Sequence, residues 1–305
     1  MVLCIIALPV FAVLGIFSLK FRKLAKESLE CLFRTATLRK CRSGLDDRIK
    51  SSFTGKIMKI SPKTASFVYR NFRIISFLIL ALFLWSTYSS AAGVYNYAKY
   101  GSCDGPSEDG FCVLDPAGAN TKTSGLDMDF NGQVILPSLE NDDPIIGNKN
   151  AQITIIEFGC YACPYTKKAE PIVKEVLDYY DGKVNLQFKT AVIPHHNTSY
   201  MTALAANCAM EQGKYDEYHA LLFENQKNIT KELIYELAGN AGIGNGQFIE
   251  CIRSEKYRQE IESDTLQGYN AGITGTPTFF INGQRITGPK PFRAFKTIIN
   301  AELKK

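Results

Sequence analysis

Two cysteines three positions apart are the residues of this chain best suited to chemistry. Cys160 and Cys163 follow an apolar, β-branched run at residues 153–159, and a helix-like pattern follows them. A C-x-x-C pair at a strand–helix junction can close a small ring and exchange electrons with another pair of thiols. A Gly-Thr-Pro-Thr segment at residues 275–278 comes more than a hundred residues later. Together the two motifs predict a thiol–disulfide site.

The elements that must position this site alternate between strand and helix. Residues 153–159 predict a buried strand, residues 164–180 a helix with apolar side chains at spacings of three and four, and residues 184–193 a second strand. This order implies a parallel strand pair joined by a crossover helix. The chain then predicts several helices within 198–267, a hairpin with an Asn-Gly turn at 278–287, and a closing helix at 291–303. Residues 142–305 therefore predict a mixed α/β unit large enough to fold on its own.

Two apolar segments precede this unit, and we predict that both are transmembrane helices. The segments at 1–19 and 74–94 contain no charged side chain, and each is long enough to span a bilayer at about 1.5 Å per residue. Residues 20–73 between them hold 15 Lys and Arg against 4 Asp and Glu, a balance of +11. Since the whole chain carries +5, residues 74–305 carry −6. A cleaved signal peptide fits the first segment poorly, because the positive charge follows the apolar run.

The charge distribution predicts a topology. The positive-inside rule places residues 20–73 in the cytoplasm and the chain after about residue 95 outside the cell membrane. A first segment that only lies against the membrane is the alternative. Cys31 and Cys41 in the basic loop have no neighbouring pair of metal ligands, so we interpret them as reduced cytosolic thiols.

Residues 95–141 are rich in Gly, Asp, Asn and Ser, which favours turns over a packed core. We therefore predict an extracytoplasmic tether. Cys103 and Cys112 could close a ten-residue loop within it, a clip worth about 2–3 kcal/mol. The alternative is a second dithiol that relays electrons to the membrane.

The order of motifs resembles the DsbA-like form of the thioredoxin fold. Residues 143–151 are similar to that family's lead-in, 205–223 to its helical insertion, and 277–283 to its closing hairpin. The resemblance covers residues 142–305. It implies an α/β thioredoxin fold with a helical insertion, here preceded by two predicted transmembrane helices, and the activity of a protein thiol–disulfide oxidoreductase.

The same resemblance sets the register of the cysteines. In the family an acid lies six residues before the attacking cysteine, and a helix-kinking proline lies eight residues after it. Glu157 and Pro171 stand at these distances from Cys163, and Pro164 follows it directly. A proline at the first helical position places Cys163 at the N-cap, where backbone N–H groups stabilise a thiolate. We therefore favour Cys163 as the nucleophile, with Cys160 resolving; the opposite register keeps the plain C-x-x-C interpretation and stays open.

Other roles are implied by the resemblance. Glu157 would accept or return a proton beneath the cysteines, although it could instead be a strand-end carboxylate facing water. Thr276 and Pro277 would form a cis-proline loop whose backbone binds an extended substrate. Cys208 and Cys251, each on a predicted helix, would form a structural disulfide.

The residues predict whether a metal is bound, and the resemblance implies the partners. His195 and His196 match no metal pattern, so we predict no metal and no cofactor, and we assign them to a loop or to the substrate groove. The expected substrates are extracytoplasmic proteins with thiols, the expected re-oxidant is a DsbB-like or VKOR-like membrane partner, and no nucleic acid is expected. The alternatives are a disulfide reductase or isomerase, and a redox-inactive, peptide-binding assembly factor in which Cys160–Cys163 is a structural staple.

Overall fold

A computed structural model describes residues 8, 11, 15–37, 45–59, 61–108, 110–126, 133–139 and 143–305. The chain forms two compact units, residues 1–91 and 92–305. Most of the first predicted membrane segment, residues 1–19, lies outside the described residues, as does Cys41.

The basic stretch of the first unit is helical. It forms α2 (Leu19–Ala36), α3 (Leu45–Met58) and α4 (Pro62–Arg70). Ser61 caps α4 by accepting a hydrogen bond from the backbone N–H of Thr64 at 3.4 Å. Cys31 is buried in α2 and is disulfide-bonded, so the prediction of a reduced thiol is wrong. The sequence argument had tested only for metal ligands, and folding also brings together cysteines that share no motif.

Helix α5 (Phe72–Tyr100) begins in the first unit and ends in the second. Its residues 74–100 contain an 18-residue window with a mean hydropathy of 1.8 and are the one stretch, within the described part of the chain, long and apolar enough to cross a membrane. Large apolar side chains along it are exposed, among them Phe77, Leu82 and Trp85. Length and composition therefore give one candidate membrane span among the described residues, and it overlaps the predicted 74–94.

The second unit is built on a five-stranded mixed sheet. Its central strands, β3 (Ile153–Gly159) and β4 (Val184–Thr190), run parallel, with Ile153 opposite Val184. The three other strands pair antiparallel, which gives the order β2-β4-β3-β6-β7. These strands are β2 (Ile145–Ile146), β6 (Thr278–Ile281) and β7 (Gln284–Thr287). The sheet confirms the predicted thioredoxin fold.

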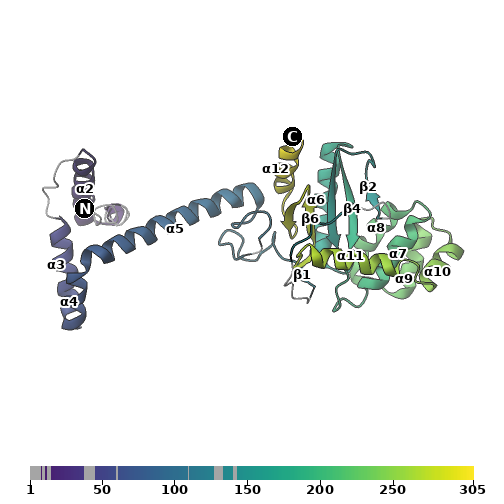
Figure 1. The fold of residues 1–305 in the computed structure, drawn as a ribbon, viewed down its shortest axis with the longest axis horizontal. Coiled ribbons are helices and arrows are strands. Elements are labelled where there is room, and N and C mark those ends of the chain that lie inside the picture. Colours follow the sequence, from purple (N-terminus) through teal and green to yellow (C-terminus); the bar gives the residue numbers. More distant parts are fainter. Residues whose placement is uncertain are drawn as a thin grey trace. The chain divides into compact units, whose positions relative to one another are not determined.

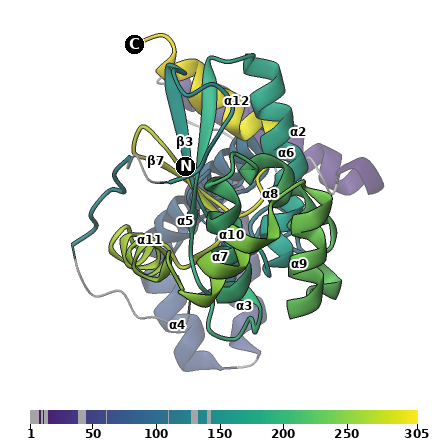
Figure 2. The same cartoon turned by 90° about the vertical axis from the view of Figure 1, so that its right-hand side faces the viewer.

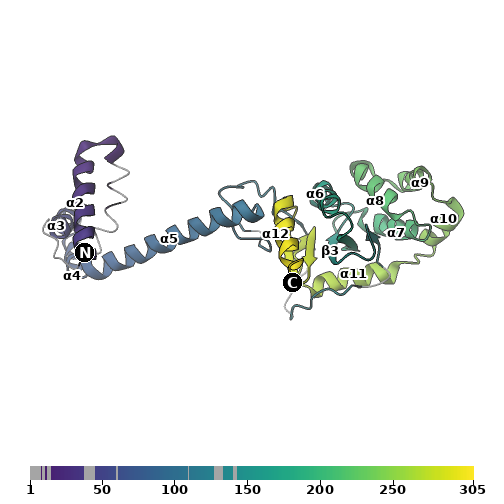
Figure 3. The same cartoon turned by 90° about the horizontal axis from the view of Figure 1, so that it is seen from above.

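Helices cover both faces of this sheet. Helices α6 (Pro164–Tyr180) and α12 (Phe292–Glu302) contact each other and share a core with the sheet. Helix α11 (Arg258–Asn270) contacts β4, and Figure 3 shows α6 and α11 on opposite sides of β3. Strand β3 therefore lies between helices on the two faces of the sheet.

The helical insertion lies at one end of the unit (Figures 1 and 2). It has its own core, in which Tyr218 and Phe248 are fully buried. A disulfide between Cys208 and Cys251 joins its first and last helices. Its elements are α7 (Ser199–Met210), α8 (Tyr215–Glu224), the 3-10 helix η1 (Gln226–Asn228), α9 (Lys231–Asn240) and α10 (Asn245–Arg253).

The first part of the predicted tether packs on the second unit. Thr287 donates from its backbone N–H to the Pro106 carbonyl at 3.0 Å and from its hydroxyl to the Ser107 carbonyl at 2.9 Å. A two-residue strand, β1 (Ser124–Gly125), pairs antiparallel with β5 (Gly275–Thr276). Residues 101–126 therefore belong to the same structural unit as the sheet.

Candidate active site

The two cysteines lie in the loop between β3 and α6, and both side chains are fully buried. The backbone N–H of Cys163 donates to the Cys160 carbonyl at 2.9 Å, which closes a turn. Cys163 is the N-cap of α6, and its sulfur accepts a hydrogen bond from the Thr166 N–H at 3.4 Å. Thr166 stands where DsbA-like proteins usually carry their second cysteine. The first turn of α6 therefore directs a backbone N–H group, which has no partner within the helix, at the Cys163 sulfur.

The predicted cis-proline loop faces Cys163. The Thr276–Pro277 peptide bond is cis, and the Thr276 carbonyl oxygen lies 3.3 Å from the Cys163 sulfur. Thr276 is fully buried, and its hydroxyl has no hydrogen-bond partner among the described residues. The fold thus brings together two segments that lie 113 residues apart in the sequence.

Cys160 occupies a different environment. Its sulfur lies 3.1 Å from the Ser199 hydroxyl and 3.6 Å from Nδ1 of His196. Burial raises the pKa of Cys160 to about 11, and the Ser199 hydrogen bond opposes this shift only in part. Burial, and then the charge of His195, lowers the pKa of His196, so its ring is neutral at pH 7. Cys160 is therefore held as a protonated thiol beside two polar side chains.

Sequence reasoning missed Ser199 altogether and gave His196 only a general groove role. Both residues lie 36 to 39 positions from Cys160. Ser199 begins α7, directly after the loop that follows β4, and its hydroxyl also accepts a hydrogen bond from the Ile193 N–H at 3.1 Å. The available signal was position, because loops that follow the carboxyl ends of neighbouring parallel strands meet at one edge of the sheet.

Glu157 lies in β3 with its side chain fully buried. Neither carboxylate oxygen has a hydrogen-bond partner within the described part of the chain. Burial raises its pKa well above the usual range, and the charges of Glu170 and Cys163 raise it further. Glu157 is thus a buried acid whose pKa responds to the charge of Cys163, and its burial excludes the water-facing carboxylate.

The insertion holds the cysteine loop in place. Nε2 of Gln226 donates to the carbonyls of Tyr161 and Cys163 at 2.7 and 2.8 Å. The Tyr161 hydroxyl lies 2.7 Å from that of Tyr215 and 3.0 Å from Nδ1 of His219. A residue between the cysteines is therefore anchored in the core of the insertion.

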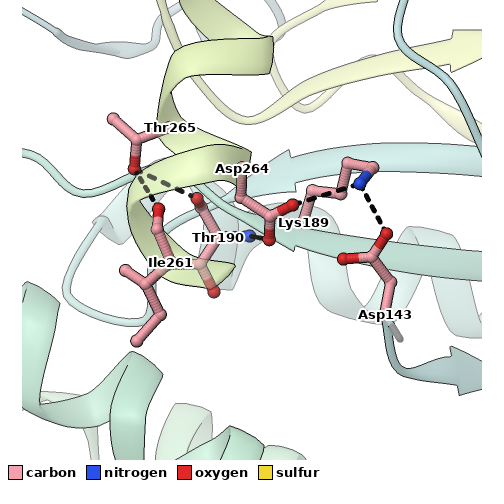
Figure 4. Close-up of polar contacts among 6 residues, drawn as sticks. All are labelled: Asp143, Lys189, Thr190, Ile261, Asp264 and Thr265. Atoms are coloured by element: carbon pink, nitrogen blue, oxygen red, sulfur yellow. Dashed lines mark hydrogen bonds and ion pairs between the residues drawn. The ribbon is translucent and has the colours of Figure 1, made fainter. Parts of the chain in front are cut away.

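A second buried polar cluster lies between β4 and α11 and is drawn in Figure 4. The Lys189 ammonium donates to Asp143 and, at 3.1 Å, to Asp264, while the Thr190 N–H donates to Asp264 at 2.9 Å. Burial alone would lower the pKa of Lys189, but the two aspartates outweigh it and the pKa is raised. Asp143, Asp264 and Glu260 could supply metal ligands by distance, but the Lys189 ammonium already binds two of these three carboxylates. We interpret this cluster as structural.

The other four cysteines of the second unit form two disulfides. Cys103 is bonded to Cys112, and Cys208 to Cys251. Among the described cysteines, Cys160 and Cys163 are the ones that are free. The fold and this free, loop-held pair define the class, a thioredoxin-fold protein with a helical insertion and a C-x-x-C pair at the end of β3.

Comparison with known proteins agrees with this class. A family model described as Thioredoxin matches residues 140–301, and the chain belongs to the thioredoxin family. The Na(+)/H(+) antiporter NhaA 3 of Salinispora tropica is 28% identical over 166 residues, which cover 54% of this chain and 26% of that protein. The Na(+)/H(+) antiporter NhaA of Herminiimonas arsenicoxydans is 25% identical over 181 residues, which cover 59% of this chain and 28% of that protein. The chain thus spans about a quarter of the length of these relatives.

Solved structures are similar over the second unit. BdbD from Bacillus subtilis is 26% identical and is matched over its whole length by 57% of this chain, with a TM-score of 0.49. A thioredoxin-like oxidoreductase from Silicibacter pomeroyi is 22% identical, with coverage of 54% of this chain and 95% of that one and a TM-score of 0.49.

Proposed function

We propose that this protein is a membrane-tethered thiol–disulfide oxidoreductase that exchanges a Cys160–Cys163 disulfide with thiol-containing proteins outside the cell membrane. The supporting observation is the Cys163 sulfur at the N-terminus of α6, 3.3 Å from the carbonyl of Thr276. A substrate strand that hydrogen-bonds to the backbone of Thr276 would bring its own sulfur to Cys163.

The two cysteines take different roles in this proposal. A substrate thiolate attacks the sulfur of Cys163 in the disulfide, the Cys160–Cys163 bond breaks, and Cys160 leaves with the electron pair. A second substrate thiolate then attacks the substrate sulfur of the mixed disulfide and releases Cys163. Two electrons pass from the substrate to the protein. Cys163 is assigned the attacking position because it faces the cis-proline loop, whereas Cys160 faces Ser199 and His196.

Proton transfer follows from the surroundings of each sulfur. Cys160, with its pKa raised to about 11, takes up a proton readily once it leaves, and the hydroxyl of Ser199 lies within hydrogen-bonding distance of it. Glu157 holds a proton on the side of Cys163, and its pKa depends on the charge of that sulfur. It can therefore supply a proton to the departing Cys163 thiolate and recover it later.

The membrane placement rests on composition and disulfides. Helix α5 contains the apolar span, and the two disulfides of the second unit are typical of an oxidising compartment outside the cytoplasm. A DsbB-like or VKOR-like membrane partner would then restore the catalytic disulfide.

The position of residues 20–73 is a separate question. Their positive charge favours the cytoplasm, whereas the disulfide of Cys31 favours an oxidising side. Labelling with an impermeant maleimide in intact cells decides this, with Ser51→Cys reporting on the first unit and Lys227→Cys on the second. We expect Lys227→Cys to be labelled; protection of that variant would contradict an external domain.

The direction of electron flow is tested by the reduction potential of the full chain in detergent, equilibrated with glutathione buffers. A potential well above the −200 to −230 mV typical of glutaredoxins supports an oxidase, and one near the −270 mV of thioredoxin supports a reductase. Cys163→Ser should abolish mixed disulfides with substrates, while Cys160→Ser should trap them. If the full chain exchanged with no dithiol, the pair would be a structural staple.

A further inference from the structure

We infer that residues 123–126 are a built-in pseudosubstrate. This segment, Thr-Ser-Gly-Leu, occupies the strand position that the proposed function gives to a substrate, with Ser124 in the place of the substrate cysteine. The inference rests on that proposed function and specifies which substrate chains the site accepts.

The backbone of the segment pairs with the cis-proline loop as an added strand. Ser124 lies opposite Thr276 and Gly125 opposite Gly275 in antiparallel register. The pairing continues for one more residue, because the Leu126 N–H donates to the Thr274 carbonyl at 3.2 Å. This is the strand-addition mode by which extended peptides bind an exposed sheet edge.

Close approach of the two strands depends on a glycine. A Cβ added to Gly275 would lie 2.3 Å from the carbonyl oxygen of Ser124, a backbone atom that cannot move aside without displacing the segment. The cis-proline loop is thus shaped to accept a strand at this distance.

The side chain of Ser124 reaches the reacting atom. Its Oγ lies 3.2 Å from the sulfur of Cys163. A cysteine differs from serine only by sulfur in place of that oxygen, so a substrate cysteine in this position would present its sulfur to Cys163. Serine cannot form a disulfide, so the segment occupies the groove without reacting.

Leu126 supplies the second anchor. Its side chain is 2% exposed and packs in an apolar cluster with Cys160, Cys163 and Phe158. It also borders a cleft of about 560 Å³, whose lining includes Val192, Pro194 and Ile261. The groove therefore favours substrates with a small residue directly after the reacting cysteine and a large apolar residue next, and these substrates must first displace residues 123–126.

The geometry is tested by cross-linking. In a Cys160→Ser background, Ser124→Cys should form a disulfide with Cys163 when the full chain is treated with oxidised glutathione, with loss of two hydrogens by mass. Lys122→Cys in the same background is the matched control and should give mainly mixed disulfides with glutathione. If position 124 cross-linked no better than position 122, the inference would be wrong.

Occlusion is tested by kinetics. The probe is a Thr-Cys-Gly-Leu peptide whose cysteine carries thionitrobenzoate; attack by reduced Cys163 forms the peptide–Cys163 disulfide and releases the coloured thionitrobenzoate anion. If the open groove is a minor state populated to 10% or less, Leu126→Ser should speed release about tenfold or more. Leu139→Ser, which changes a leucine that is 60% exposed, should leave the rate unchanged. A Leu-Gly-Cys-Thr peptide should react more slowly than the probe in every variant.

The two levels of the proposal fail differently. Exchange at the same rate in wild type and Leu126→Ser, without a cross-link at position 124, would overturn the pseudosubstrate and leave the proposed function intact. A cross-link without thionitrobenzoate release in any variant would support the groove geometry and overturn the exchange function. Circular dichroism of Leu126→Ser checks that a changed rate does not reflect unfolding.

Discussion

Buried acids lie on both faces of the same sheet, and they differ in whether a cation binds to their carboxylates. On the α11 face, Asp143 and Asp264 share the Lys189 ammonium. Glu157 lies on the same face of β3 as Ile153 and Ile155, which pack against α6. Neither of its carboxylate oxygens has a hydrogen-bond partner among the described residues. Burial raises the pKa of Asp264 to about 8 and that of Glu157 well above its usual range, so the two faces differ in pairing and not in the direction of the pKa shift. We therefore predict that the paired acids contribute to stability and that Glu157 contributes to disulfide exchange.

The largest expected effect is on the paired side. Lys189→Met should lower the free energy of unfolding by about 3–5 kcal/mol, because it leaves buried carboxyl groups without their cation. Urea unfolding of the full chain in detergent measures the loss. Lys183→Met, at an exposed position just before β4, is the control and should cost little. A small loss in Lys189→Met would show that the cluster is not structural.

The cysteines extend the contrast. A pKa of about 11 leaves Cys160 with about 300-fold less thiolate at pH 7 than a cysteine of ordinary pKa near 8.5. Since the Cys163 sulfur accepts a backbone hydrogen bond at the N-cap of α6, iodoacetamide should modify Cys163 in the Cys160→Ser variant faster than Cys160 in the Cys163→Ser variant. The two rates should converge in urea, where both thiols are exposed. Faster modification of folded Cys160 would reverse the assigned roles.

The unpaired acid should matter for rate. Glu157→Gln keeps the shape but removes the titrating proton, so disulfide exchange at neutral pH should slow by about 100-fold. Its pH–rate profile should also lose the step that belongs to Glu157 in the wild type. Glu175→Gln, an exposed position on α6, serves as control. An unchanged rate and profile would place Glu157 with the structural acids.

The last effect is on stability and depends on pH. Folding raises the Glu157 pKa, so its contribution is fully present below the unfolded pKa of about 4.3 and declines by about 1.4 kcal/mol per pH unit until the folded pKa is passed. The difference in unfolding free energy between wild type and Glu157→Gln should therefore move in favour of the variant as the pH rises from 4 to 8. Denaturant midpoints at several pH values measure this difference. A difference independent of pH would mean that folding does not shift the pKa.

The sequence predicted those parts of the fold that rest on local patterns. The run at 153–159, the helix at 164–180 and the Asn-Gly hairpin each carry their own periodicity or turn signal, and each forms where predicted. Asn282 and Gly283 both adopt the positive φ angles, 47° and 81°, that this turn requires.

What the sequence did not predict depends on distant contacts. In β4 the apolar residues alternate with Asn185, Gln187 and Lys189, a pattern that suggests a water-facing side. All three are buried, because α11 and the segment before β2 cover that face. Ser199 and Ser124 reach the cysteines in the same way, from elements whose own sequences carry no redox motif.

One amide connects the two parts of the second unit. Gln226 lies in the insertion between α8 and α9, and it holds the carbonyls on either side of Ala162. The insertion is itself closed by the Cys208–Cys251 bond, and its helices pack around α7. Tyr161 of the reactive loop and both cysteines of this permanent disulfide lie in one buried cluster, so the bond braces the same core that supports the loop.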